Sequence, residues 1–139
     1  MRFCAWVDKR LPTPEEWQLA AAGPEGRTYP WGEEEPTDEH LCWKRGITPC
    51  PVGSKPKGAT PLGLLDMAGN VQELSSGDGC WLKKPNIPCV LKSPLVHGGA
   101  WNACVSASRC HKPGSFTTVV AHFQTPDTVG FRCARTAPQ

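Results

Sequence analysis

The sequence lacks any hydrophobic run long enough to cross a membrane, and any lysine or arginine cluster with interleaved aromatic residues. No apolar segment follows the first four residues, as a signal peptide would require. The net charge is only +2, which gives little general attraction for polyanions. We therefore expect neither a nucleic-acid partner nor insertion into a membrane, and the compartment stays open.

The common motifs of catalysis and metal binding are also missing. There is no Gly-x-Ser-x-Gly elbow, no phosphate-binding loop and no His-Glu-x-x-His. No Cys-x-x-Cys occurs, so a structural zinc site has little support. The histidines His40, His97, His111 and His122 fall in loops or beside glycines, where a surface role is commoner than a ligand or a base.

Proline, glycine, tryptophan and cysteine are what the chain does have. Fifteen prolines and fourteen glycines in 139 residues favour a loop-rich fold, while six tryptophans argue against disorder. We expect one domain over residues 1–139. The even cysteine count suggests disulfides, although nothing marks the chain for secretion. We expect some disulfides without assigning pairs among Cys4, Cys42, Cys50, Cys80, Cys89, Cys104, Cys110 and Cys133.

The clearest local signal is for a helix over residues 14–22. Thr13 is a good N-cap, Pro14 suits the first helical position, and Glu16 completes a capping box. Gly23 ends the helix. The other expected elements are a strand or helix end at 4–7, an aromatic turn at 29–32 that packs on the helix, a short strand at 62–65, a loop at 75–79, a strand with a glycine pair at 95–101, and a closing strand at 129–134.

Residues 63–73 form the stretch around which we expect the chain to be organised, a tight Gly-Asn turn flanked by Asp66 and Glu73. If the turn folds back, the two carboxylates and the carbonyls between them make an oxygen set suited to calcium. The alternative from local chemistry is a strand that ends in a turn with two solvated acids.

Several segments together resemble the formylglycine-generating enzyme and sulfatase-modifying factor family. In the family's order they are Arg10-Leu11-Pro12-Thr13 with Glu16-Trp17, Tyr29-Pro30-Trp31-Gly32, Pro51-Val52-Gly53, Asp66-Met67-Ala68-Gly69-Asn70-Val71 with Glu73, His97-Gly98-Gly99-Ala100-Trp101-Asn102, and Gly130-Phe131-Arg132. The resemblance implies an α+β, C-type-lectin-like fold, loop-rich, with short strands and one or two helices. It covers only the C-terminal part of a typical family domain.

The resemblance also implies one calcium site. The matching ligand positions are Asp66, Gly69, Val71 and Glu73. A second family calcium site needs an asparagine near Leu41, and none is present.

Enzymes of this family hold copper(I) between two cysteines after a Gly-Gly-Ser strand. The matching pair here is Cys104 and Cys110, with five residues between them and Ala100 in place of the serine. A copper-dependent oxidase acting on a peptide cysteine is therefore one hypothesis. A non-catalytic accessory subunit of the family is another.

The variable proteins of diversity-generating retroelements resemble this chain too, and they place varied residues before the final Gly-Phe-Arg. Residues 102–128 here are small, polar and aromatic, which suits an adaptable binding surface on a rigid frame. We expect a protein or cell-surface ligand to contact Trp101, Asn102, Ser106, Ser108, Arg109, His111, Lys112, Phe116, His122 and Phe123.

Overall fold

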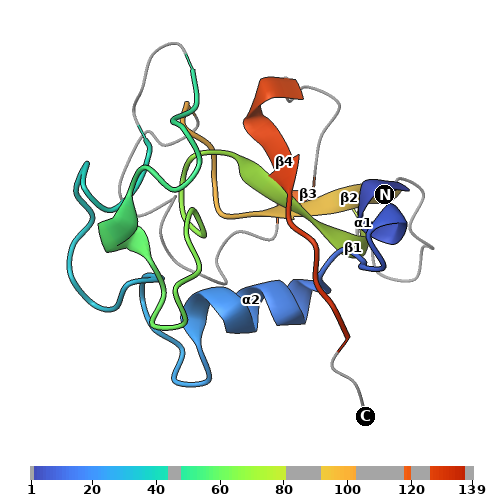
Figure 1. Ribbon diagram of the computed structural model, residues 1–139, viewed down its shortest axis with the longest axis horizontal. Coiled ribbons are helices and arrows are strands. Elements are labelled where there is room, and N and C mark those ends of the chain that lie inside the picture. Colours follow the sequence, from blue (N-terminus) through green and yellow to red (C-terminus); the bar gives the residue numbers. More distant parts are fainter. Residues whose placement is uncertain (1, 44–47, 81–91, 103–117, 120–125, 137–139) are drawn as a thin grey trace.

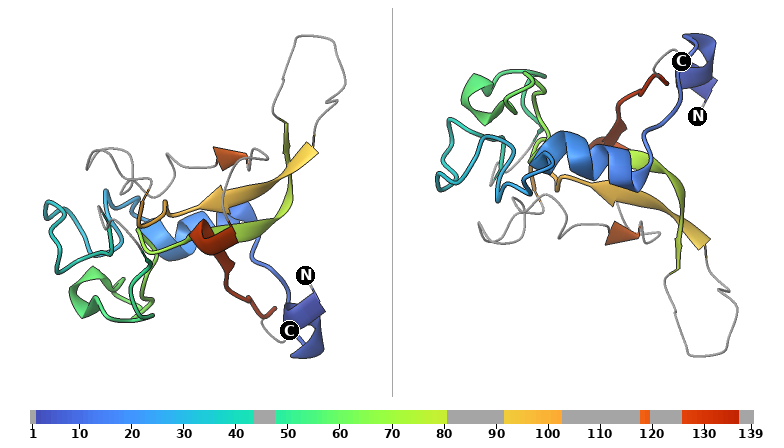
Figure 2. Two further views of the ribbon diagram at one scale, coloured as in Figure 1. Left: turned by 90° about the horizontal axis from the view of Figure 1, so that it is seen from above. Right: turned by 90° about the horizontal axis from the view of Figure 1, so that it is seen from below.

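A four-stranded sheet and the helix that packs against it position the rest of the chain in the computed structural model (Figure 1 and Figure 2). The structure describes residues 2–43, 48–80, 92–102, 118–119 and 126–136. The strand order is β3-β2-β1-β4. The elements are α1 (Arg2–Trp6), α2 (Pro14–Ala22), η1 (Pro56–Gly58), β1 (Gln72–Cys80), β2 (Lys92–His97), β3 (Thr118–Val119), η2 (Pro126–Thr128) and β4 (Val129–Phe131).

Helix α2 has the predicted bounds and the predicted cap. The Thr13 hydroxyl accepts from the Glu16 backbone N–H, and the Glu16 carboxylate accepts from the Thr13 N–H at 2.8 Å. Arg10 adds two contacts of 2.6 Å to the same carboxylate. Gly23, at φ 69°, ends the helix and donates to Leu19. Residues 4–6 are helical and not a strand, since α1 spans Arg2–Trp6.

The strand β1 lies at the centre of the sheet. It pairs antiparallel with β2, with Glu73 opposite His97, and parallel with β4, with Glu73 opposite Gly130. The loop predicted at 75–79 is therefore wrong. Pairing with β2 at Leu74 and again at Asp78 makes this polar segment part of a strand. The register shifts between these two residues, around Gly77 at φ 89°.

The strand predicted at 62–65 is also wrong, because Thr60 closes a turn there. Its N–H donates to the Leu64 carbonyl at 2.9 Å, and its own carbonyl accepts from Gly63 at 2.8 Å. These local bonds take the groups that a strand neighbour would need. The strand predicted at 95–101 ends early, at His97, because the glycine pair that follows turns the chain with positive φ at both residues.

Two small apolar clusters make the core. One joins Trp17 and Ala21 of α2 to Met67, and the other joins Leu41, Trp43 and Ala68. The aromatic turn at 29–32 forms as expected, but its Trp31 packs against the second cluster rather than the cluster that contains the helix.

Two disulfides tie the described chain together. Cys4–Cys133 links α1 to the segment after β4, and Cys42–Cys50 closes a short loop. Disulfides were predicted without their pairing, and these two confirm that expectation. In the part of the chain that the structure describes, no helix is long and apolar enough to span a membrane.

Candidate functional site

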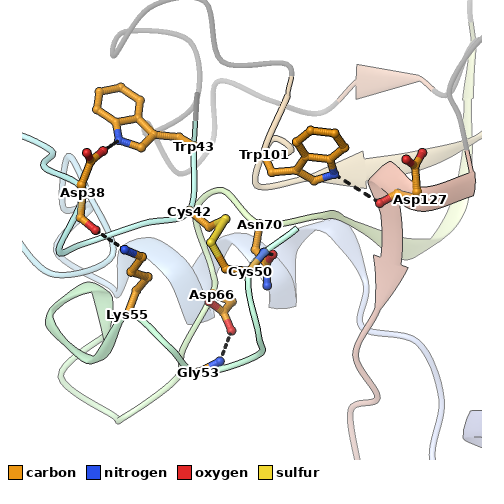
Figure 3. The surroundings of a disulfide bond; sticks show 10 residues. All are labelled: Asp38, Cys42, Trp43, Cys50, Gly53, Lys55, Asp66, Asn70, Trp101 and Asp127. Carbon is orange, nitrogen blue, oxygen red and sulfur yellow. Dashed lines mark hydrogen bonds between the residues drawn. A yellow bond between two sulfur atoms is a disulfide. The ribbon is translucent and has the colours of Figure 1, made fainter. Parts of the chain in front are cut away.

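The turn at 66–70 is the point where separate segments of the chain meet (Figure 3). Its backbone takes left-handed conformations at Asp66 (φ 56°), Gly69 (φ 74°) and Asn70 (φ 60°). A Cβ on Gly69 would lie 2.5 Å from the Cys42 carbonyl oxygen, so only glycine fits there. The Gly69 N–H donates to Gly98 at 2.8 Å, which joins the turn to the glycine pair after β2.

Asn70 holds two further segments. Its N–H donates to the Cys42 carbonyl at 2.9 Å, and its side-chain oxygen accepts from the Cys50 N–H at 3.0 Å. The Cys42–Cys50 disulfide spans the same two residues, as Figure 3 shows. The Asn70 carbonyl accepts from the Trp101 N–H at 2.7 Å. One buried asparagine therefore fixes both the disulfide loop and the start of the 102–128 segment.

Both predicted carboxylates have protein donors. The Asp66 carboxylate accepts from the Gly53 N–H at 2.7 Å (Figure 3). Glu73, which is 7% exposed, accepts from the Trp17 ring N–H at 2.7 Å. Its two oxygens also accept from Arg132 at 2.5 and 2.7 Å, so a guanidinium neutralises the buried carboxylate.

These contacts bear on the expected calcium site. The contacts of Glu73 fit a guanidinium, and a metal ion would have to share or take this carboxylate from Arg132. Among the described residues, no three histidine, cysteine or acidic side chains gather where they could hold a metal. Calcium at Asp66, Gly69, Val71 and Glu73 stays a prediction.

Trp101 belongs to the frame, not to an exposed surface as predicted. It is 5% exposed, and its ring N–H points to the Asp127 carbonyl oxygen at 3.4 Å (Figure 3). Trp101 thus joins the start of the 102–128 segment to its end. The next residue, Asn102, is exposed, as expected.

The remaining predicted site residues lie outside the described residues. They are Ser106, Ser108, Arg109, His111, Lys112, Phe116, His122 and Phe123 of the expected surface, and Cys104 and Cys110 of the expected copper pair.

The sequence reasoning did not foresee the role of Arg132 or of His97. Arg132 also donates to the Leu65 carbonyl at 2.9 Å, so it joins β4 to the approach of the central turn. His97 stacks on Trp17 with ring centroids 4.8 Å apart, and its Nε2 lies 2.9 Å from the Ser75 hydroxyl. Burial lowers the pKa of His97, which favours the neutral ring. The sequence signals that could have pointed to these roles are the Gly-Phe-Arg motif for Arg132 and the His-Gly-Gly motif for His97.

The arrangement defines a loop-rich C-type-lectin-like domain, in which short strands and a central turn hold long connecting segments. The sequence model of the sulfatase-modifying factor enzyme 1-like domain matches residues 1–137. The chain therefore belongs to this family.

Individual relatives differ in what their names say. The chain is 31% identical over 153 residues to the inactive C-alpha-formylglycine-generating enzyme 2 of Mus musculus, covering 97% of this chain and 46% of that protein. It is 37% identical over 100 residues to the hercynine oxygenase of Mycobacterium tuberculosis (strain ATCC 25618 / H37Rv), covering 68% of this chain and 22% of that one. The chain thus spans less than half the length of these relatives.

Among solved structures, variable protein 1 of Treponema denticola superimposes with a TM-score of 0.64. The two share 23% identity, and the match covers 88% of this chain and 46% of that one. This likeness shows that the fold is shared.

Proposed function

We propose that this chain is a ligand-binding protein that displays a variable surface on a C-type-lectin-like scaffold, as the variable proteins of diversity-generating retroelements do. The observation that carries the proposal is the closure of the 102–128 segment. Trp101 directly precedes the segment, and its ring N–H points to the carbonyl of Asp127, near the end of the segment. The strand β4 then begins at Val129. A segment held at both ends by the frame can change its sequence while the frame keeps its contacts.

Most described contacts of the frame come from residues outside that segment. The exceptions are β3, which pairs with β2, and the Asp127 carbonyl, which faces the Trp101 ring N–H. The central turn is fixed by Cys42, Cys50 and Gly98, and the sheet is fixed by the Glu73–Arg132 ion pair. These contacts supply a reason why the segment could vary without unfolding the domain.

A binding role without catalysis has further support. A relative that matches 97% of this chain carries the name of an inactive formylglycine-generating enzyme. The position where the resemblance expects a serine is Ala100, which is fully buried and has no hydroxyl to offer. The ligand would be a protein or cell-surface group. Within the segment, Arg109 and Lys112 would suit acidic groups, while Phe116 and Phe123 would be apolar anchors.

The test compares two libraries of the whole chain. One randomises Ser106, Ser108, Arg109 and His111 of the 102–128 segment, and the matched control randomises four positions of the central turn, 67–70. We expect most members of the first library to unfold within about 5 °C of the parent, because the proposal assigns these residues to the variable surface and not to the frame. Most members of the control library should fail to fold. The proposal is wrong if the two libraries lose folded members equally often.

The copper-dependent oxidase is the alternative, and its residues would be Cys104 and Cys110. Copper(I) titration separates the two functions. Stoichiometric binding that disappears in both Cys104→Ser and Cys110→Ser would favour the oxidase. For a non-catalytic accessory subunit, the measurement is a stable complex with a longer member of the family.

A further inference from the structure

We propose that a groove beside α1 binds a small amphipathic anion, an aromatic or aliphatic group that carries a carboxylate. The groove lies between the N-terminal segment and β1, and its volume is about 640 Å³. This volume is within the usual range of small-molecule sites. The residues that matter for its chemistry are Ala5, Lys9, Leu11, Leu74, Ser76 and Pro94.

The apolar part of the ligand has an apolar floor to rest on. Leu74 of β1 lines the groove, and Phe131 of β4 is its partner in the parallel pair, so the two side chains lie on the same face of the sheet. The ring centroids of Phe131 and Phe3 are 5.8 Å apart, and those of Phe3 and Trp6 are 6.0 Å apart. We call these three residues the aromatic rim; they are not lining residues of the groove, and the pairing of Phe131 with Leu74 is what connects them to it.

The aromatic rim is unusually open to water. Trp6 is 79% exposed, Phe3 53% and Phe131 40%. Large aromatic side chains gathered at one exposed place mark an interaction site more often than scattered surface residues do. An apolar group of the ligand would bury the apolar lining residues Ala5, Leu11, Leu74 and Pro94 and could extend from Leu74 toward the aromatic rim.

The charge of the ligand follows from the polar groups of the groove. None of the described lining residues is acidic, and two are cationic. The Arg10 guanidinium is already engaged by Glu16, whose pKa this contact lowers to about 2. Lys9 is therefore the cation left to meet a carboxylate, because no ion pair of Lys9 is found among the described residues.

Of the three hydroxyl groups among the described lining residues, two already have hydrogen-bond partners. Ser75 is engaged by His97 at 2.9 Å, and Thr13 caps helix α2. The Ser76 hydroxyl is the remaining neighbour of the floor, and it would donate to the second oxygen of the carboxylate.

The walls of the groove are preformed. The Cys4–Cys133 disulfide fixes α1, and the Ser76 N–H donates to the Pro12 carbonyl at 2.7 Å, which fastens the N-terminal segment to β1. Arg10 pairs through its backbone with Ala134. Ligand binding therefore loses little conformational entropy by ordering this site.

The test uses anilinonaphthalene sulfonate, an aromatic anion whose fluorescence rises in apolar sites, titrated into the full chain. Ala5→Trp fills the groove from an exposed position, and Lys9→Glu reverses its charge. The controls change features of the same kind elsewhere: Leu62→Ser removes an exposed leucine, and Lys55→Glu reverses a lysine that does not line the groove.

We expect the parent chain to bind about one probe molecule, Ala5→Trp to lose binding, and Lys9→Glu to weaken it by about tenfold, which corresponds to about 1.4 kcal/mol. Both controls should stay within about twofold of the parent. The proposal is overturned if the parent does not bind, or if Ala5→Trp and Lys9→Glu bind as tightly as the controls. It is also overturned if sedimentation shows a dimer that Ala5→Trp dissociates, since a second copy would then occupy the groove. None of the groove's described lining residues belongs to the 102–128 segment, so either proposal can fail alone.

Discussion

The two disulfides should differ in how much they stabilise the domain, because they close loops of very different length. Cys4 and Cys133 are 129 residues apart, and Cys42 and Cys50 are 8 apart. In the chain-entropy model, a cross-link stabilises by restricting the unfolded chain, and its effect grows with the logarithm of the loop length. For these separations the model gives about 5 kcal/mol for the long loop and about 2.5 kcal/mol for the short one.

The perturbation replaces each pair separately by serine and leaves the other cysteines unchanged. The assay is urea unfolding under oxidising conditions, with the slope of the transition fitted together with its midpoint. Total stabilities of single domains are about 5–15 kcal/mol, so Cys4→Ser with Cys133→Ser should remove a large share. Each kcal/mol should lower the melting temperature by about 3 °C.

The position of Cys42–Cys50 at the central turn could make this disulfide more important than its short loop suggests. Its two residues also hydrogen-bond with Asn70, so its loss can add an enthalpic effect. The reasoning is refuted if replacing Cys42 and Cys50 costs more than replacing Cys4 and Cys133. A loss below about 1 kcal/mol for the long loop would also refute it.

Four further predictions concern single residues or one ion. Arg132→Gln leaves the buried Glu73 without its cation and should cost about 3 kcal/mol in urea unfolding, whereas a loss below about 1 kcal/mol would mean that water screens the pair. Thr13→Ala removes the cap of α2 and should cost about 1 kcal/mol, with Thr13→Ser as the control that keeps it. The lowered pKa of His97 means that the unfolded chain takes up a proton first as pH falls, so stability should decrease below pH about 6.5, and His97→Asn should flatten this part of the pH profile. If calcium binds at Asp66 and Glu73, adding it after chelation should raise the melting temperature, and an unchanged temperature would remove the site.

Local sequence signals were sufficient where the chain makes its own contacts. The bounds of α2 could be predicted because Thr13, Pro14 and Glu16 stabilise its first turn without help from other segments. The importance of the 66–70 turn could be predicted because a Gly-Asn pair favours left-handed backbone.

Contacts between distant segments could not be predicted from local patterns. The strand β1 contains Ser75, Ser76 and Gly77, which favour a loop, and pairing with β2 on both sides of them, at Leu74 and Asp78, keeps them within a strand. Glu73 meets a residue 59 positions later, Arg132, so the sequence revealed the carboxylate but not its partner. Trp101 was read as surface because aromatic residues suit binding sites, while the hydrogen bond to Asn70 places it in the frame.

The measurement that tests the central claim most directly is deep sequencing of the codons for residues 95–135 across a natural population that carries this gene. A diversified binding protein predicts dense amino-acid variation between 102 and 128, with β2, Trp101 and Gly130–Arg132 nearly constant, because the frame depends on them. A segment that is as constant as its flanks would contradict the account, and the copper titration of Cys104 and Cys110 would then decide between the remaining functions.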